Sequence, residues 1–98
     1  MPKMIFEWDE NKNNANIQKH KVSFEEAKTV FYDENALVSH DPEHSDLEDR
    51  FIIFGFSSVA RILLVCFCER NQGNVIRIIT ARKLTKTEAH QFSRKLGK

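Results

Sequence analysis

The spacing of hydrophobic residues changes once along the chain, from a helical period in its first part to alternation in its second. Before either pattern, residues 4–8 are aromatic and β-branched, which predicts a short opening strand. Asp9 then suits a helix N-cap, because its carboxylate can accept hydrogen bonds from the free amides of the first turn. This helix is expected to run to about Lys19, since His20 to Val22 break the pattern.

A capping box predicts the start of a second helix. Ser23 stands three residues before Glu26, so that each side chain can bond the backbone amide of the other residue. Hydrophobic residues then recur on one helix face up to about Tyr32, namely Phe24, Ala27, Val30 and Phe31.

Four strands are expected in the second part of the chain, over residues 36–40, 50–56, 61–69 and 75–82. The sequence Asn71-Gln72-Gly73-Asn74 is typical of a tight hairpin, and a capping box from Thr85 to Glu88 opens a last helix that runs to about Leu96. This order favours a single α+β domain over residues 1–98, with an antiparallel sheet and helices packed on one of its faces.

The simplest register of the last hairpin sets Cys68 across from Arg77. That register puts Arg77 on one face of the sheet and places Ile76, Ile78, Thr80 and Arg82 on the other, together with Glu69. A one-residue bulge would exchange these faces.

The longest apolar stretch, Ile62 to Cys68, is far shorter than the roughly 20 residues of a membrane-spanning helix. The first residues lack the apolar region and cleavage site of a signal peptide, so a cytoplasmic protein without membrane contact is expected.

Charge is distributed very unevenly although the net charge is only +1. Residues 1–49 carry 5 Lys and Arg against 12 Asp and Glu, whereas residues 50–98 carry 10 against 2. Arginines begin, end or interrupt the expected strands of the basic half, and their planar guanidinium groups suit bidentate contacts with phosphate. The set therefore favours an anion-binding surface, although any single arginine is more often a rim residue.

The histidines are the natural candidates for a general acid or base. His20 ends the first predicted helix beside Lys19 and is the most interesting of the four. His40 and His44 are separated by Pro42, which removes the helical spacing of a metal-binding pair. No Gly-rich phosphate loop or clustered acidic set for Mg²⁺ is visible, so we expect no cofactor and no metal. RNA cleavage can proceed without either, because the 2′-hydroxyl of the substrate can act as the nucleophile.

Several motifs together resemble the BrnT toxins of bacterial type II toxin-antitoxin pairs. They are Phe6-Glu7-Trp8-Asp9, Lys12, Asn16, Lys19-His20, Val22 to Ala27, Asp41-Pro42, His44-Ser45, Glu48, Arg50-Phe51, Gly55, Glu69-Arg70 and Arg77 to Arg82. Thr80 stands where the pattern usually has Ser, which keeps the hydroxyl.

The resemblance implies a RelE-like fold and an endoribonuclease that inhibits translation. It also implies neutralisation by a BrnA-type ribbon-helix-helix antitoxin, in a heterotetramer with an antitoxin dimer that supplies contacts to operator DNA. Family motif and chemistry together predict that Arg50, Arg77 and Arg82 contact the scissile phosphate. His20 with Lys19 is expected to act as the general acid or base, and Glu69 is expected to orient a reacting group or to act as a base. Backbone contacts with RNA are assigned to Arg61, Lys83 and Lys86.

Two alternatives stay open. The first is a non-catalytic module that binds nucleic acid or an acidic protein through its basic half. The second is a metal-dependent nuclease that uses His40, His44 and nearby acids.

Overall fold

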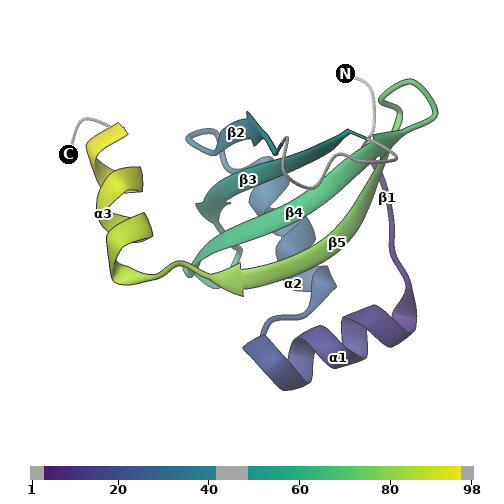
Figure 1. Ribbon diagram of the computed structural model, residues 1–98, viewed down its shortest axis with the longest axis horizontal. Helices are drawn as coiled ribbons and strands as arrows, with labels where there is room; N and C mark the ends of the chain where they lie inside the picture. Colours follow the sequence, from purple (N-terminus) through teal and green to yellow (C-terminus); the bar gives the residue numbers. More distant parts are fainter. Residues whose placement is uncertain (1–3, 42–48, 96–98) are drawn as a thin grey trace.

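The computed structural model describes residues 4–41 and 49–95, which form one sheet and the helices around it (Figure 1). The elements in chain order are β1 (Ile5–Glu7), α1 (Glu10–His20), α2 (Phe24–Thr29), the 3₁₀ helix η1 (Val30–Tyr32), β2 (Leu37–His40), β3 (Arg50–Phe56), β4 (Ile62–Arg70), β5 (Val75–Lys83) and α3 (Lys86–Lys95). The predicted α+β class is confirmed. His44 and the predicted helix end at Leu96 lie outside the described residues.

The helices begin where the sequence places capping residues. The Asp9 carboxylate accepts a hydrogen bond from the amide of Lys12 at 3.1 Å, and the Ser23 hydroxyl accepts one from the amide of Glu26 at 3.1 Å. α1 ends at Lys21, whose φ of 60° is the left-handed conformation that terminates many helices. These local bonds fix the boundaries of α1 and α2 before any packing is considered.

The strand order in the sheet is β1-β5-β4-β3-β2. β2 to β5 pair antiparallel as predicted, but β1 pairs in parallel with β5, from Ile5 opposite Val75 to Glu7 opposite Arg77. The expectation of a wholly antiparallel sheet is therefore wrong at this edge. No hairpin joins β1 to β5, so no turn signal in the sequence could specify the direction of that pairing.

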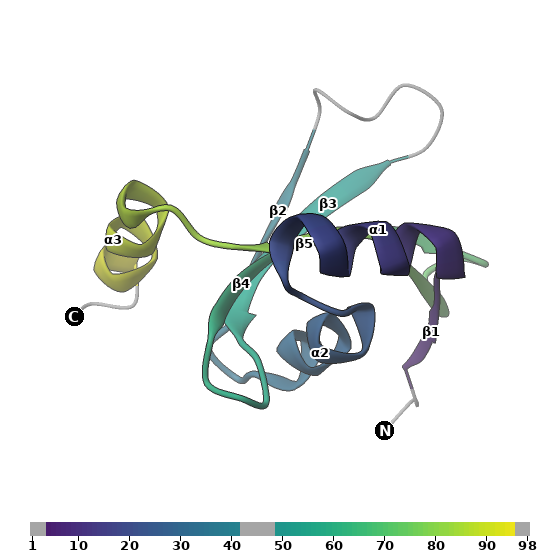
Figure 2. The same cartoon turned by 90° about the horizontal axis from the view of Figure 1, so that it is seen from below.

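One face of the sheet packs against α2 and η1 and forms the hydrophobic core, here called the core face. Ile53, Val65, Phe67 and Ile78 project from it toward Phe24. Figure 2 shows α2 on this side, whereas α1 lies beside the β5 edge of the sheet, so the expectation that the helices pack on one face is wrong for α1. The opposite face carries Arg50, Arg77 and Arg82 and is called the arginine face below.

A β-bulge in β5 decides which residues reach the arginine face. Cys68 pairs with Arg77 and Phe67 with Ile78, as the simplest register predicts, but Cys66 pairs with Thr80. Ile79 is therefore the extra residue, and beyond it the alternation of faces is reversed. The prediction that Thr80 and Arg82 share a face with Ile76 and Ile78 is wrong, because the bulge turns both toward the face of Arg77.

The last helix does not join α2 on the core face either. α3 extends beyond the end of β5, apart from α1 and α2 (Figures 1 and 2). Its Phe92 is only 2% exposed and packs edge-on against Phe56 of β3, with ring centroids 6.2 Å apart. The α3 helix is thus anchored through one aromatic contact and through the ion pair described below.

Candidate functional site

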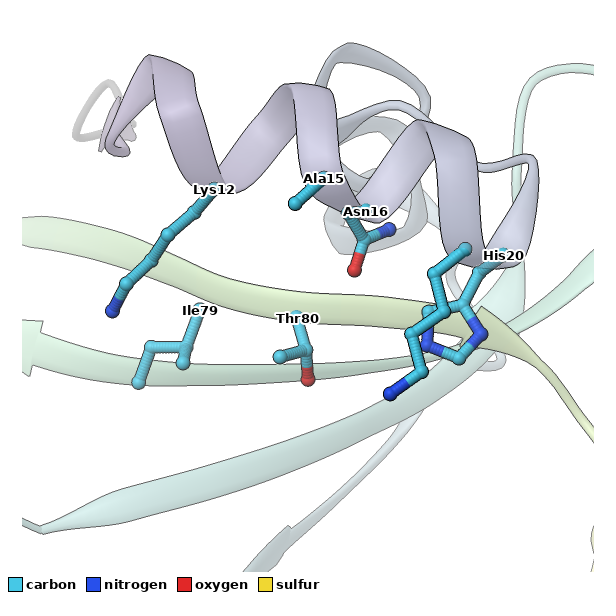
Figure 3. Close-up of a pocket in the computed structure, with 7 residues that line it drawn as sticks. Lys12, Ala15, Asn16, His20, Ile79 and Thr80 are labelled. Atoms are coloured by element: carbon cyan, nitrogen blue, oxygen red, sulfur yellow. The ribbon is translucent and has the colours of Figure 1, made fainter.

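A pocket of about 270 Å³ lies between α1 and β5. Its lining is formed by Lys12, Ala15, Asn16, Lys19, His20, Ile79 and Thr80 (Figure 3). The α1 members recur at intervals of three and four residues, which places them on one side of the helix. The β5 members are the bulged Ile79 and its successor Thr80, so the pocket exists where the strand departs from regular pairing.

Basic groups lie on both sides of Thr80 along the pocket (Figure 3). Lys12 reaches toward β5 at one end of the pocket, His20 lies at the other end, and Thr80 lies between them (Figure 3). Within residues 4–41 and 49–95, no carboxylate lies within ion-pair distance of Lys12, Lys19 or His20. The pocket can therefore receive an anion without first displacing a protein carboxylate from these groups.

The arginine face borders this pocket through β5. Glu7, Arg77, Cys68 and Arg50 are paired in turn across β1, β5, β4 and β3, and Thr80 follows Arg77 on the same face. Because strands lie about 5 Å apart, Arg50 and Arg77 begin about 10 Å from each other. A chain of phosphates could run along this row toward the pocket.

Carboxylates already engage two of the arginines assigned to the scissile phosphate. The Arg77 guanidinium donates to the Glu7 carboxylate at 2.7 Å, and this hydrogen bond raises the pKa of Arg77. Arg70 also lies 3.7 Å from the same carboxylate. An incoming phosphate at Arg77 would have to share or replace Glu7.

Arg82 is held more tightly. Its two terminal nitrogens donate to the two oxygens of Glu88 at 2.7 and 2.9 Å, and Glu88 also accepts from the amide of Thr85 at 2.9 Å. The Arg82 guanidinium, followed by the Thr85 bonds, lowers the pKa of Glu88 to about 2 despite partial burial. The pair ties the start of α3 to β5.

The residues assigned to the RNA backbone occupy two different places. Arg61 lies just before β4 and donates to the Glu26 carboxylate of α2 and, at 3.0 Å, to the Lys21 carbonyl. Lys83 pairs with Leu63 on the core face and adds to the lowering of the Glu26 pKa, whose main cause is Arg61. Lys86 is the first residue of α3 and is exposed.

Glu69 is separated from the other assigned catalytic residues. It pairs with Ile76 on the core side of the hairpin end, whereas Arg50 and Arg77 project from the opposite face. Lys12 and Thr80 were not singled out as site residues from the sequence. The spacing of Lys12, Asn16 and His20 at intervals of four was the available signal, since it predicts a shared helix side.

Comparison with known families gives this geometry a context. Residues 8–88 match the family described as the ribonuclease toxin BrnT of type II toxin-antitoxin systems. The chain belongs to the BrnT family. This match begins just after β1 and reaches the start of α3, so it includes the pocket and the arginines of the arginine face.

A solved structure supports the fold of this BrnT chain. The Brucella abortus ribonuclease toxin BrnT, determined at 1.1 Å, superposes with a TM-score of 0.62 at 22% identity. The alignment covers 86% of this chain and all of the Brucella chain. No curated protein matches the chain by sequence.

Residues 4–41 and 49–95 contain no group of three or more His, Cys, Asp or Glu side chains arranged to hold a metal ion. None of the described helices has the length and apolar character needed to cross a membrane.

Proposed function

We propose that this BrnT-family ribonuclease toxin is a metal-independent endoribonuclease that arrests translation by cutting RNA in the pocket between α1 and β5. The observation that carries the proposal is that Lys12, Lys19 and His20 line one pocket together with Thr80. Three basic groups on a rigid helix can move protons and stabilise negative charge, which are the two tasks that RNA cleavage asks of a protein.

The reaction uses the 2′-hydroxyl of the RNA as its nucleophile. A base removes the 2′ proton, the 2′ oxygen forms a bond with phosphorus, and the bond from phosphorus to the 5′ oxygen breaks. An acid returns a proton to the leaving 5′ oxygen, so the products are a 2′,3′-cyclic phosphate and a 5′-hydroxyl. His20 performs one proton transfer with Lys19 as its partner, while Lys12 stabilises charge on the phosphorane and Thr80 donates to a phosphate oxygen.

The arginine face binds the RNA on either side of the cut. Arg77 and Arg82 flank Thr80 along β5, and Arg50 lies two strands from Arg77. RNA phosphates replace Glu7 and Glu88 as partners of the two β5 arginines, because phosphate and carboxylate accept the same bidentate hydrogen bonds. Lys86 extends the surface beyond the strand. Arg61 and Lys83 lie around Glu26, so they are less available for contact with RNA. Glu69 has no role in this arrangement.

The toxin acts within a type II pair, whose antitoxin is a protein that neutralises it by binding. We infer a BrnA-type ribbon-helix-helix antitoxin, assembled as a dimer with toxin into a heterotetramer and contacting operator DNA itself. Copurification of the two proteins from coexpression, followed by measurement of the mass of the complex, tests this stoichiometry.

The cleavage proposal is tested with purified protein, single-stranded RNA and excess EDTA. We expect cleavage to persist in EDTA, to yield 2′,3′-cyclic phosphate ends, and to cease on the same sequence made as DNA. The His20→Gln variant should bind RNA but cut it on the order of 10²-fold more slowly, whereas His90→Gln on the exposed side of α3 should cut normally.

Salt-dependent RNA binding without cleavage in either EDTA or Mg²⁺ would instead support a non-catalytic binding module. Cleavage that EDTA abolishes would contradict metal independence.

A further inference from the structure

Asn16 is a buried polar residue in the middle of α1, with only 6% of its surface exposed. Its amide nitrogen donates to the Ala81 carbonyl at 2.7 Å and to the Val22 carbonyl at 2.8 Å. Its amide oxygen accepts from the Ala81 backbone N–H at 3.2 Å. Both polar atoms of the side chain are therefore satisfied, and two of the three bonds go to a single residue of β5.

The bonds to Ala81 take the place of the hydrogen bonds that a neighbouring strand would make. β1 covers the edge of β5 only from Val75 to Arg77, so the edge beyond the bulge at Ile79 has no strand beside it. A neighbouring strand would offer one acceptor and one donor to the free N–H and C=O of a residue at this edge. The Asn16 amide offers the same pair, and α1 thereby occupies the position that another strand would take.

This contact lies at the pocket. Ala81 directly follows Thr80, and Asn16 itself lines the pocket between Lys12, one turn before it, and His20, one turn after it. A shift of α1 along β5 would break the paired bonds to Ala81 and would move Lys12 and His20 relative to the Thr80 hydroxyl. The remaining bond to Val22 fixes the chain where it leaves α1 and turns toward α2.

We propose that Asn16 is a positioning residue, whose paired hydrogen bonds with Ala81 hold the basic groups of α1 in register with Thr80. The proposal rests on the pocket being the cleavage site, as proposed above. Asn16 does not contact the reacting atoms in this scheme. It keeps α1 at one position along the edge of β5. Among the described residues, no other side chain bonds the Ala81 backbone at this edge.

Asn13 provides a matched control on the same helix. It is 8% exposed, accepts from the Phe24 amide at 2.9 Å and donates to Glu10 at 3.0 Å. Removing its side chain also deletes two hydrogen bonds, but one of them joins α1 to α2, the other lies within α1, and neither reaches β5. Asn13→Ala therefore lowers stability without loosening the α1–β5 register.

The experiment compares Asn16→Ala, Asn16→Asp and Asn13→Ala at a temperature where urea titration shows each protein to be folded. Aspartate has the size of asparagine and can accept from Ala81 N–H, but it cannot donate to the Ala81 carbonyl. We expect both Asn16 variants to reduce kcat for RNA cleavage on the order of 10²-fold with little change in KM, as misplacement of catalytic groups does. Asn13→Ala should keep the wild-type kcat.

Two NMR measurements separate this inference from the cleavage proposal, because neither needs activity. Hydrogen exchange at the Ala81 amide should accelerate, and the ring resonances of His20 should shift, in the Asn16 variants and not in Asn13→Ala. If wild-type protein fails to cut RNA but these changes occur, the cleavage proposal falls and the register role of Asn16 stands. Equal kcat losses in all three variants, or unchanged Ala81 exchange and His20 resonances in the Asn16 variants, would overturn the positioning role.

Discussion

Glu7 and Arg77 stand opposite each other on the parallel pair β1 and β5, with a carboxylate oxygen 2.7 Å from a guanidinium nitrogen. This ion pair joins the acidic first half of the chain to the basic second half at the edge of the arginine face. Since the carboxylate occupies donors that a phosphate would use, we expect Glu7 to compete with RNA for Arg77. The uneven distribution of charge along the sequence is thus partly neutralised by contacts within the fold.

Glu7→Gln should therefore strengthen RNA binding. The variant keeps a hydrogen-bond acceptor beside Arg77 but removes the charge, so a phosphate gains access at a smaller electrostatic cost. We expect a severalfold lower Kd, and we expect Arg77→Ala to reduce the slope of log K against log salt by about 1, the effect of one lost phosphate contact. Fluorescence anisotropy with labelled RNA at several salt concentrations measures both quantities.

A matched substitution at Glu10 controls for net charge. Glu10→Gln removes the same charge from the first turn of α1, away from the β1–β5 pair. An equal gain in RNA affinity from Glu10→Gln would show that net charge, and not release of Arg77, causes the effect.

The Arg82–Glu88 pair should make stability depend on pH in acid. The pKa of Glu88 is lowered from 4.5 to about 2 in the folded protein. A group with a lowered folded pKa contributes its stability fully above the unfolded pKa and loses it as pH falls through the folded value. The contribution of this pair is therefore present at pH 7 and disappears between about pH 4.5 and about pH 2.

Glu88→Gln isolates that contribution. We expect the variant to unfold with about 1 kcal/mol less free energy at pH 7, because both side chains are partly exposed to water. The difference between wild type and variant should shrink as the pH falls below about 4.5 and vanish near pH 2. Urea titrations across this range measure it, and a difference that stays constant with pH would contradict the ion-pair origin.

Arg61 should contribute mainly to stability. Its guanidinium bridges Glu26 of α2 and the Lys21 carbonyl, and Glu26 also accepts from the Ser57 hydroxyl at 2.7 Å. We expect Arg61→Ala to lower the free energy of unfolding by about 1–3 kcal/mol, since it leaves a carboxylate with fewer donors. Lys86→Ala, at the exposed start of α3, should leave stability unchanged and weaken RNA binding instead. The reverse assignment, with RNA affinity lost in Arg61→Ala and retained in Lys86→Ala, would restore Arg61 to the binding surface.

The sequence predicted those features that depend on neighbouring residues. Asp9 and Ser23 cap their helices through bonds within three residues, and the Cys68–Arg77 pairing follows from a short hairpin. The parallel pairing of β1 with β5 joins residues 70 positions apart, and no local signal encodes it. The bulge at Ile79 did leave a local signal, because the adjacent Ile78 and Ile79 interrupt the alternation of a regular strand, but the simplest register does not take it into account.

That bulge explains why the site was only partly predicted. His20 and Lys19 could be selected by their place at the end of a helix, and Arg77 by its place on a strand. Lys12 had only its four-residue spacing to indicate a shared helix side with His20. Its proximity to Thr80 could not be predicted, because that requires both the reversal of faces at Ile79 and the docking of α1 through Asn16. The carboxylate partners of Arg77 and Arg82 were likewise hidden, since these pairs form only in the folded chain.

The Thr80 hydroxyl provides a direct test of the pocket. Thr80→Val replaces the hydroxyl with a methyl group of similar size and keeps a β-branched residue in β5, so the strand and the bulge should persist. If the hydroxyl donates to a phosphate oxygen during cleavage, we expect kcat to fall about 10-fold, the effect of losing about 1.4 kcal/mol of transition-state stabilisation. Thr80→Ser retains the donor and should keep nearly the wild-type rate.

Single-turnover cleavage assays of both variants, with circular dichroism to verify folding, distinguish the hydroxyl from the methyl group. Equal rates in Thr80→Val and wild type would remove Thr80 from the mechanism, whereas a loss in Thr80→Ser comparable to that in Thr80→Val would show that the methyl group packs the pocket and that the hydroxyl is not the active element.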